Sequence, residues 1–258
     1  MAKKVVSGTR QQSILSFINE NGSATIHQLS EWLSVSEATV RRDLDDLAAS
    51  NYLERTHGGA MRVNGTSFER NHSEKMNLML EEKRKIAAKA VSLVRNGDSV
   101  FLDSGTTTFF VAQCLSYHTD LTVITNNLDV AASVELHPSS SLIVTGGMRR
   151  DNYSVLVGSL AEETIKGLYV DICFLGCDAF DPSRGVFNTN YLELGAKKLI
   201  AECGRQTVLV TDHSKFQKQA LAKVCGLKNL DVLITDSGAP ADAIKKCRQY
   251  IHQVYVTD

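Results

Sequence analysis

The sequence lacks the cysteine patterns of disulfide-bonded and metal-binding proteins. Its six cysteines are scattered, and none forms a CxxC pair or has a histidine nearby at metal-ligand spacing. This distribution predicts small buried side chains in a reducing compartment. The basic N-terminus is not followed by an apolar segment, and no hydrophobic run approaches the length of a membrane span. We therefore expect a cytoplasmic protein with no membrane contact, no metal site and no cofactor.

An excess of positive charge is also missing. The chain has 28 Lys and Arg against 29 Asp and Glu, which gives a formal net charge of −1. Within residues 1–63 the two signs balance as well. Bulk attraction is therefore not enough to hold the protein on nucleic acid, and any DNA contact must depend on where individual charges lie.

Residues 8–63 have the pattern of a small helical domain that ends in a hairpin. Apolar residues recur at helical spacing in three short segments, Thr9–Asn21, Thr25–Leu33 and Ser36–Leu47. Two short strands around Gly58-Gly59 are expected to follow. This order predicts a DNA-binding domain whose helix-turn-helix lies at about residues 25–44.

After a polar, Asn-rich stretch at 64–80, which we interpret as a linker, residues 81–258 alternate between strands and helices. Strands are expected at Ser99–Leu102, Leu121–Thr125, Ser141–Thr145, Asp171–Gly176, Thr207–Val210, Val232–Thr235 and Gln253–Val256. Helices are expected at Glu82–Val94, Thr107–Leu115, Asn127–Glu135, Ser159–Lys166, Tyr191–Cys203 and Ala241–Tyr250. Short apolar strands bounded by Gly, Asp and Asn are typical of a buried, mainly parallel sheet with helices on both faces. The predicted fold class is an α/β main domain with a small N-terminal winged helix-turn-helix domain.

The third predicted helix has the layout of a recognition helix. Its apolar stripe, which includes Val40 and Leu44, must face the core. The outward face and its flanks then carry Ser36, Ala38, Thr39, Arg41 and Arg42. A small residue permits close approach to a major groove, hydroxyls bond phosphate, and Arg reaches guanine edges or phosphate. The alternative is a solvated face with incidental arginines.

In the second domain, the strongest candidate for a phosphate site is the turn Asp103–Thr108. It follows a predicted strand, opens a helix, and combines Gly105 with neighbouring hydroxyls. Backbone N–H groups at a helix start favour an anion, although ordinary capping also explains such a turn. Further polar turns follow other strands, at Thr125–Asn127, Gly146-Gly147, Gly176–Asp181 and Asp212–Phe216. Ligands of open α/β sheets bind at that edge.

Two motifs carry a resemblance to a known family. Residues 35–44 read VSEATVRRDL, and residues 53–60 read LERTHGGA. Both resemble the N-terminal signature of the DeoR family of bacterial sugar-metabolism regulators. The C-terminal half is similar to that family's sensor domain at Asp103–Thr107, Thr125-Asn126, Gly146-Gly147, Leu175–Asp181, Asn190–Lys197 and Asp212–Phe216. Departures are Asn51 and Ala179, where the family commonly has Gly.

The resemblance covers the chain from about Gly8 and implies several properties. They are a fold similar to ribose-5-phosphate isomerase, binding of double-stranded operator DNA as a dimer or higher homo-oligomer, and repression of a carbohydrate-utilisation operon that a phosphorylated sugar relieves. The candidate DNA-binding residues are Ser36, Ala38, Thr39, Arg41, Arg42, Arg55, His57 and Gly58. The candidate effector-binding residues are Asp103, Ser104, Gly105, Thr106, Thr107, Asn126, Gly146, Asp178, Asp181, Glu193, Lys197 and Lys215.

Two alternatives stay open at this point. Glu193 and Lys197 have the i,i+4 spacing of a surface ion pair. Asp178 and Asp181 have a carboxylate spacing that a sugar-phosphate isomerase uses for proton transfer. However, Arg184–Phe187 occupies the place of the Lys- and Gly-rich loop that such an enzyme carries, and Arg does not exchange protons near neutral pH. We therefore expect a binding pocket without catalytic residues rather than an enzyme.

Overall fold

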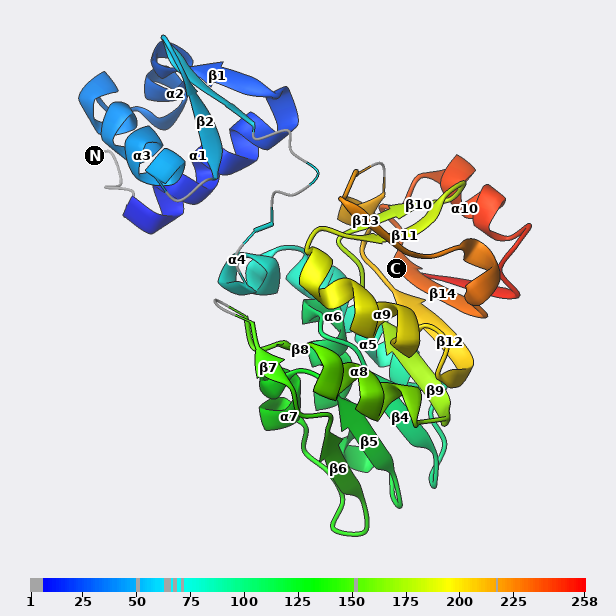
Figure 1. The fold of residues 1–258 in the computed structure, drawn as a ribbon. Coiled ribbons are helices and arrows are strands. Elements are labelled where there is room, and N and C mark those ends of the chain that lie inside the picture. Colours follow the sequence, from blue (N-terminus) through cyan, green and yellow to red (C-terminus); the bar gives the residue numbers. More distant parts are fainter. Residues whose placement is uncertain are drawn as a thin grey trace. The chain divides into compact units, whose positions relative to one another are not determined.

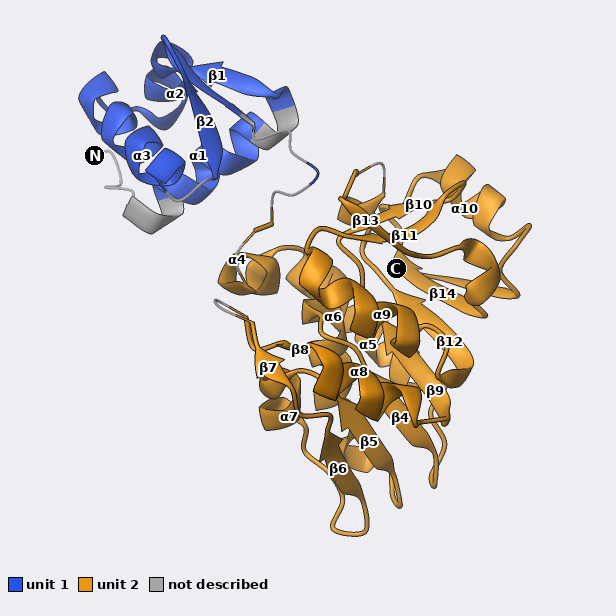
Figure 2. Ribbon diagram, viewed as in Figure 1, with its two compact units in different colours: residues 1–68 blue, residues 69–258 orange. Residues whose placement is uncertain are grey.

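The computed structural model describes residues 7–49, 52–62, 66, 69–70, 72–150, 153–216 and 218–258. The chain divides into two compact units, residues 1–68 and residues 69–258 (Figure 2). Among the described residues, no helix combines the length and the apolar character needed to cross a membrane.

Unit 1 is three helices and a three-stranded antiparallel sheet (Figure 1). Its elements are α1 (Ser7–Asn21), β1 (Ser23–Thr25), α2 (Ile26–Leu33), α3 (Glu37–Ala49), β2 (Leu53–Thr56) and β3 (Gly59–Arg62), and the strand order is β1-β3-β2. One apolar cluster, which includes Ile14, Leu29, Val40 and Leu44, packs the three helices against the sheet. The predicted winged helix-turn-helix is confirmed, with β1 as an additional strand.

Local chemistry fixes the turn between α2 and α3. Thr25 caps α2 through a capping box, in which its hydroxyl accepts from the Gln28 backbone and the Gln28 side chain accepts from the Thr25 backbone. Ser34 ends α2 in the left-handed conformation with φ 53°. The chain therefore leaves α2 sharply, and α3 starts three residues later.

The main feature of unit 2 is a seven-stranded parallel sheet in the order β15-β14-β12-β9-β4-β5-β6. The strands are β4 (Ser99–Leu102), β5 (Thr122–Thr125), β6 (Ser141–Val144), β9 (Val170–Leu175), β12 (Gly204–Val210), β14 (Val232–Asp236) and β15 (Gln253–Thr257). The helices are α4 (His72–Asn77), α5 (Leu80–Val91), α6 (Thr106–Gln113), α7 (Leu128–Ser133), α8 (Ser159–Lys166), α9 (Leu194–Ile200) and α10 (Ala241–Cys247).

Helices cover both faces of the sheet, as the sequence predicts. Phe101 on β4 packs in one core with residues of α8, α9 and α10, while its neighbour Leu102 packs in another with α5 and α6. Successive residues of a strand point to opposite faces, so near-continuous apolar runs supply both cores.

Two features of unit 2 differ from expectation. A second, three-stranded sheet joins β10 (Ala179–Asp181), β11 (Gly185–Asn188) and β13 (Ala222–Cys225), and a small ribbon pairs β7 (Met148–Arg149) with β8 (Leu156–Val157). The second difference concerns the expected linker at 64–80. Residues 69–80 belong to unit 2 and include α4, because their polar side chains pair with groups inside that unit.

Candidate functional site

The outward face of α3 carries the residues expected to meet DNA. Val40, Leu44 and Leu47 are buried, whereas Ser36, Ala38, Arg41 and Arg42 are exposed and Thr39 is half-buried. The Ser36 and Thr39 hydroxyls lie 2.9 Å apart in a hydrogen bond. Arg41 pairs with Glu37 at 3.0 Å, one helical turn away.

A buried ion pair that the sequence analysis missed ties α3 to α1. Asp43 is 3% exposed, although it stands on the helix that carries the exposed arginines. Its two carboxylate oxygens accept from Arg10 at 2.5 and 2.9 Å. This bidentate contact restricts the rotation of α3 about its own axis.

The hairpin between β2 and β3 presents two of the remaining candidates. His57 and Gly58 form its exposed turn. Arg55 is engaged within unit 1, because its Nε lies 2.9 Å from Asp45 Oδ1 and its guanidinium donates to the Gly59 carbonyl at 2.8 Å. In this arrangement Arg55 holds the hairpin against α3.

Unit 2 contains a cavity at the carboxyl ends of its central strands. The empty volume is about 570 Å3, including solvent at the mouth. Eight of the predicted effector residues line it, namely Ser104, Gly105, Thr106, Thr107, Asp178, Glu193, Lys197 and Lys215. The prediction that polar turns of several strands meet at one edge therefore holds for these residues.

The turn before α6 forms one wall of the cavity. Gly105 precedes the first helical residue, and a Cβ at that position would lie 3.3 Å from the Thr108 hydroxyl and 3.8 Å from Gly176. The Thr108 hydroxyl itself donates to the carbonyls of Asp103 and Gly105. The backbone N–H groups of the first helical turn thus remain available to a group in the cavity.

A buried ion pair lies against the cavity floor. Asp103 is fully buried, and it accepts from Lys197 Nζ at 2.5 Å and from the Gly176 N–H at 2.9 Å. Burial lowers the pKa of Lys197, but the Asp103 and Glu193 carboxylates outweigh this effect and raise it, so the side chain stays a cation. Asp103 therefore acts through Lys197 rather than lining the cavity itself.

The surface-pair interpretation of Glu193 and Lys197 is wrong. Their exposures are 4% and 2%, and each has a different main partner. Glu193 Oε1 lies 3.0 Å from Arg150 Nε, an ion pair whose geometry is not that of a hydrogen bond. Burial raises the pKa of Glu193, and Lys197 and Arg150 only partly offset that shift.

Asp178 is held at the cavity wall by two contacts. Its Oδ1 accepts from Lys75 Nζ at 2.9 Å, and its Oδ2 accepts from the Thr189 N–H at 2.9 Å. Burial raises the pKa of Asp178, but Lys75 and Lys215 more than offset it and hold the pKa well below its usual range. The carboxylate is therefore ionised at neutral pH.

Besides Asp103, three predicted effector residues do not line the cavity. Asn126 is buried beside β8, with its amide 3.4 Å from the Leu156 carbonyl. Gly146 follows β6 in a turn with φ 72°. Asp181 ends β10, where it accepts from the Ser183 N–H at 2.7 Å. Each follows or ends a strand as expected. Asn126 and Asp181, however, bond to backbone groups rather than facing the cavity, and Gly146 shapes the turn after its strand.

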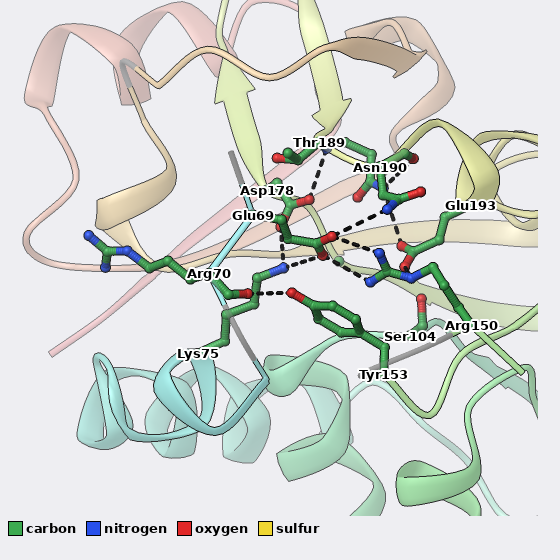
Figure 3. A network of polar contacts seen from close by, with 12 residues as sticks. Glu69, Arg70, Lys75, Ser104, Arg150, Tyr153, Asp178, Thr189, Asn190 and Glu193 are labelled. Carbon is green, nitrogen blue, oxygen red and sulfur yellow. Dashed lines mark hydrogen bonds and ion pairs between the residues drawn. The ribbon is translucent and has the colours of Figure 1, made fainter. Parts of the chain in front are cut away.

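The sequence analysis missed a set of lining residues, three of which come from the expected linker. Glu69, His72 and Lys75 line the cavity, and so do Tyr153 and Asn188. Asn127 lines it too and comes from the predicted polar turn Thr125–Asn127. Figure 3 shows the Glu69 carboxylate between Lys75 and Arg150, with Asp178 beside Glu69 and also joined to Lys75. For Glu69, His72 and Lys75, the sequence shows only a polar, Asn-rich stretch that was interpreted as a linker.

Comparison with known proteins identifies both units. The DeoR-like helix-turn-helix domain matches residues 10–66, and the DeoR C terminal sensor domain matches residues 79–237. Relatives include a putative aga operon transcriptional repressor of Escherichia coli O157:H7, 35% identical over 96% of this chain and 93% of that protein. The glycerol-3-phosphate regulon repressor of Escherichia coli K12 is 32% identical over 92% and 93% of the two chains.

Similarity to solved structures is lower and covers part of the chain. It includes ribose 5-phosphate isomerase A from Neisseria gonorrhoeae, with a TM-score of 0.36, 19% identity and 55% of each chain covered. A ribose 5-phosphate isomerase from Plasmodium falciparum matches with a TM-score of 0.36 and 18% identity over 52% of each chain. The family matches are decisive: the chain belongs to the DeoR family of DNA-binding transcription regulators.

Proposed function

We propose that this regulator represses a carbohydrate-utilisation operon and releases its operator when a phosphorylated sugar occupies the unit 2 cavity. The observation that carries the proposal is the cavity itself. Its wall combines the N–H groups of a helix start at Ser104–Thr107 with the cations Lys75, Lys197 and Lys215. A phosphate favours such a set of donors, and the ionised Asp178 is suited to accept from sugar hydroxyls.

DNA binding is proposed to use the outward face of α3 in a major groove. Arg42 and Ala38 are exposed on that face, and His57 and Gly58 stand at the tip of the hairpin. The other candidates already have partners within unit 1, namely Ser36, Thr39, Arg41 and Arg55. We propose that they contact DNA phosphates or hold in place the residues that contact them.

The isomerase alternative has less support. Asp181 is bonded to its own turn, and Asp178 has a pKa held below its usual range, which makes it a poor proton donor near neutral pH. Arg184 is exposed in a turn, and Gly185–Phe187 begins the buried strand β11 rather than a lysine-bearing loop.

A homo-oligomer is part of the proposal, because paired recognition helices need a partner copy. The edge strand β6 supports it: Leu142, Ile143 and Val144 are exposed, so both faces of this strand leave apolar side chains uncovered. We expect Ile143→Lys to lower the oligomer order in sedimentation at micromolar concentration, with Lys166→Glu as a charge-change control elsewhere on the surface. An unchanged sedimentation coefficient would place the interface on another surface.

The experiment that tests the effector is a thermal-shift screen of the full chain with pairs of phosphorylated and unphosphorylated sugars. We expect a subset of the phosphorylated members to raise the melting temperature, and the free sugars to have little effect. A hit should then lower operator affinity in a fluorescence anisotropy titration at fixed salt. Equal shifts by both members of a pair would contradict a phosphate site in the cavity.

A further inference from the structure

The first residue of unit 2 places an anion inside the cationic wall of the cavity. Glu69 directly follows unit 1 in the sequence, and its side chain is 12% exposed. Its carboxylate accepts from Arg150 at 2.8 and 3.1 Å, one bond to each oxygen, and from Lys75 at 2.9 Å (Figure 3). A carboxylate held by a bidentate Arg and a Lys has the contacts that a bound phosphate or carboxylate ligand would have.

We propose that Glu69 is a tethered internal anion, which an anionic effector displaces from Lys75 and Arg150. This inference rests on the proposed effector site and names the step by which its occupation reaches the DNA-binding unit. Glu69 and Lys75 both line the cavity. An incoming phosphate and the Glu69 carboxylate therefore compete for Lys75 and repel one another at close range, and a displaced Glu69 also leaves Arg150.

Other contacts show that Glu69 holds a whole segment rather than only its own side chain. The Arg150 guanidinium lies over the Tyr153 ring at 3.6 Å, and the Tyr153 hydroxyl donates to the Arg70 carbonyl at 2.5 Å. Lys75 itself stands on α4. Loss of the Glu69 contacts thus weakens the hold on Glu69 and Arg70, because Arg150 no longer binds the segment and the Tyr153 bond to the Arg70 carbonyl is left alone.

Release of this segment lengthens the connection between the last strand of unit 1 and the first residues that unit 2 holds in place. Unit 1 has its last strand residue at Arg62, so seven residue steps reach Glu69 and ten reach His72, the first residue of α4. At full extension these steps span roughly 25 Å and roughly 35 Å. A longer connection lowers the effective concentration of the second DNA-binding unit at its half-site. The oligomer then binds an operator with two half-sites more weakly.

The test uses the full chain without DNA, with inorganic phosphate as the probe. Glu69→Gln keeps the size of the side chain and removes the competing charge. We expect it to lower the phosphate concentration that gives half of the thermal shift by about tenfold, because the cations are no longer occupied. Glu81→Gln is the matched control: it removes a carboxylate from an exposed pair with Arg84 on α5 and should leave that concentration unchanged.

A second readout is amide hydrogen exchange of residues 69–77. In the wild type, phosphate should speed exchange there, and in Glu69→Gln exchange should already be fast without phosphate. Equal phosphate response in the wild type and Glu69→Gln, or slower exchange on phosphate addition, would overturn the proposal, and so would the absence of phosphate binding to either protein. Failure of the proposed function has a different signature, in which no sugar phosphate alters operator affinity.

Discussion

Arg42 is the side chain whose loss should alter base recognition most. It stands exposed on α3, whereas its neighbour Arg41 is paired with Glu37. We predict that Arg42→Ala lowers operator affinity by about 5- to 150-fold, which corresponds to about 1–3 kcal/mol for a specific base contact. Arg42→Lys should restore only part of the affinity, because Lys lacks the bidentate fork.

The measurement for Arg42 is anisotropy at fixed salt with operator and scrambled DNA. Arg84→Ala is the control, since it removes an exposed Arg from unit 2. Loss of affinity for both DNA sequences by the same factor would mean that Arg42 contacts phosphate only, and unchanged affinity would mean that this face of α3 does not enter the groove.

Site residues could be predicted from the sequence only where neighbouring residues in the chain determine their role. The turn Ser104–Thr107 was identified because a glycine and hydroxyls at a helix start have a direct chemical meaning. Glu69 and Lys75 were assigned to a linker because charged residues usually lie in solvent, and their burial depends on Arg150 and Asp178, which are distant in the sequence. No local pattern reports such pairing.

At the scale of elements, Lys83 joins α5 to the end of α4. It is 2% exposed, and its ammonium donates to the carbonyls of Lys75 and Leu78. Its pKa is lowered to about 8, mainly by burial and also by the nearby cations Lys215 and Lys75, while Asp212 acts in the opposite direction.

This shift predicts a pH dependence of stability. The unfolded chain has a lysine pKa near 10.4, so between about pH 8 and pH 10 it binds more protons at this residue than the folded chain does. The free energy of unfolding of the wild type should therefore rise with pH relative to Lys83→Met, by at most about 1.4 kcal/mol per pH unit. Urea unfolding of both proteins at about pH 7 and about pH 10 measures the difference. A constant or shrinking difference would show that the pKa of Lys83 is not lowered.

Gly59 tests the hairpin as an element. A Cβ at this position would lie 2.0 Å from the Ala24 carbonyl oxygen, because β1 and β3 pair closely there. We predict that Gly59→Ala destabilises unit 1 by more than about 2 kcal/mol. Gly58→Ala is the matched control, since nothing lies within 4 Å of its Cβ position. In calorimetry, Gly59→Ala should lower the melting temperature of the unit 1 transition and leave that of unit 2 unchanged. If Gly58→Ala lowered it equally, the contact with the Ala24 carbonyl would not be the cause.

Elements could be predicted where burial produces a pattern. The strands of the parallel sheet were located within one or two residues, except that β12 begins three residues earlier than expected, because strands buried on both faces read as apolar runs. The sheet β10-β11-β13 was missed. Its strands are short, β11 begins at Gly185 with φ 114°, and β11 pairs with β13 across more than 30 residues of sequence, as from Asn188 to Ala222.

At the scale of the whole molecule, the surfaces proposed for DNA and effector belong to separate units. The sequence predicted both units but placed the boundary too late, since residues 69–80 belong to unit 2. This shift matters for function, because it puts the chain that follows the DNA-binding unit into the cavity wall. In this account, the effector acts on the DNA-binding unit through the chain that connects the two units.

The most direct test of this account is a measurement of the coupling in both directions. Operator affinity is titrated with and without a saturating sugar phosphate, and affinity for the same sugar phosphate is titrated with and without saturating operator, at one salt concentration. Because coupling free energies are reciprocal, we predict that each ligand weakens the other by the same factor, about 5- to 150-fold. Sugar-phosphate affinity that stays the same when the operator is bound would contradict the account.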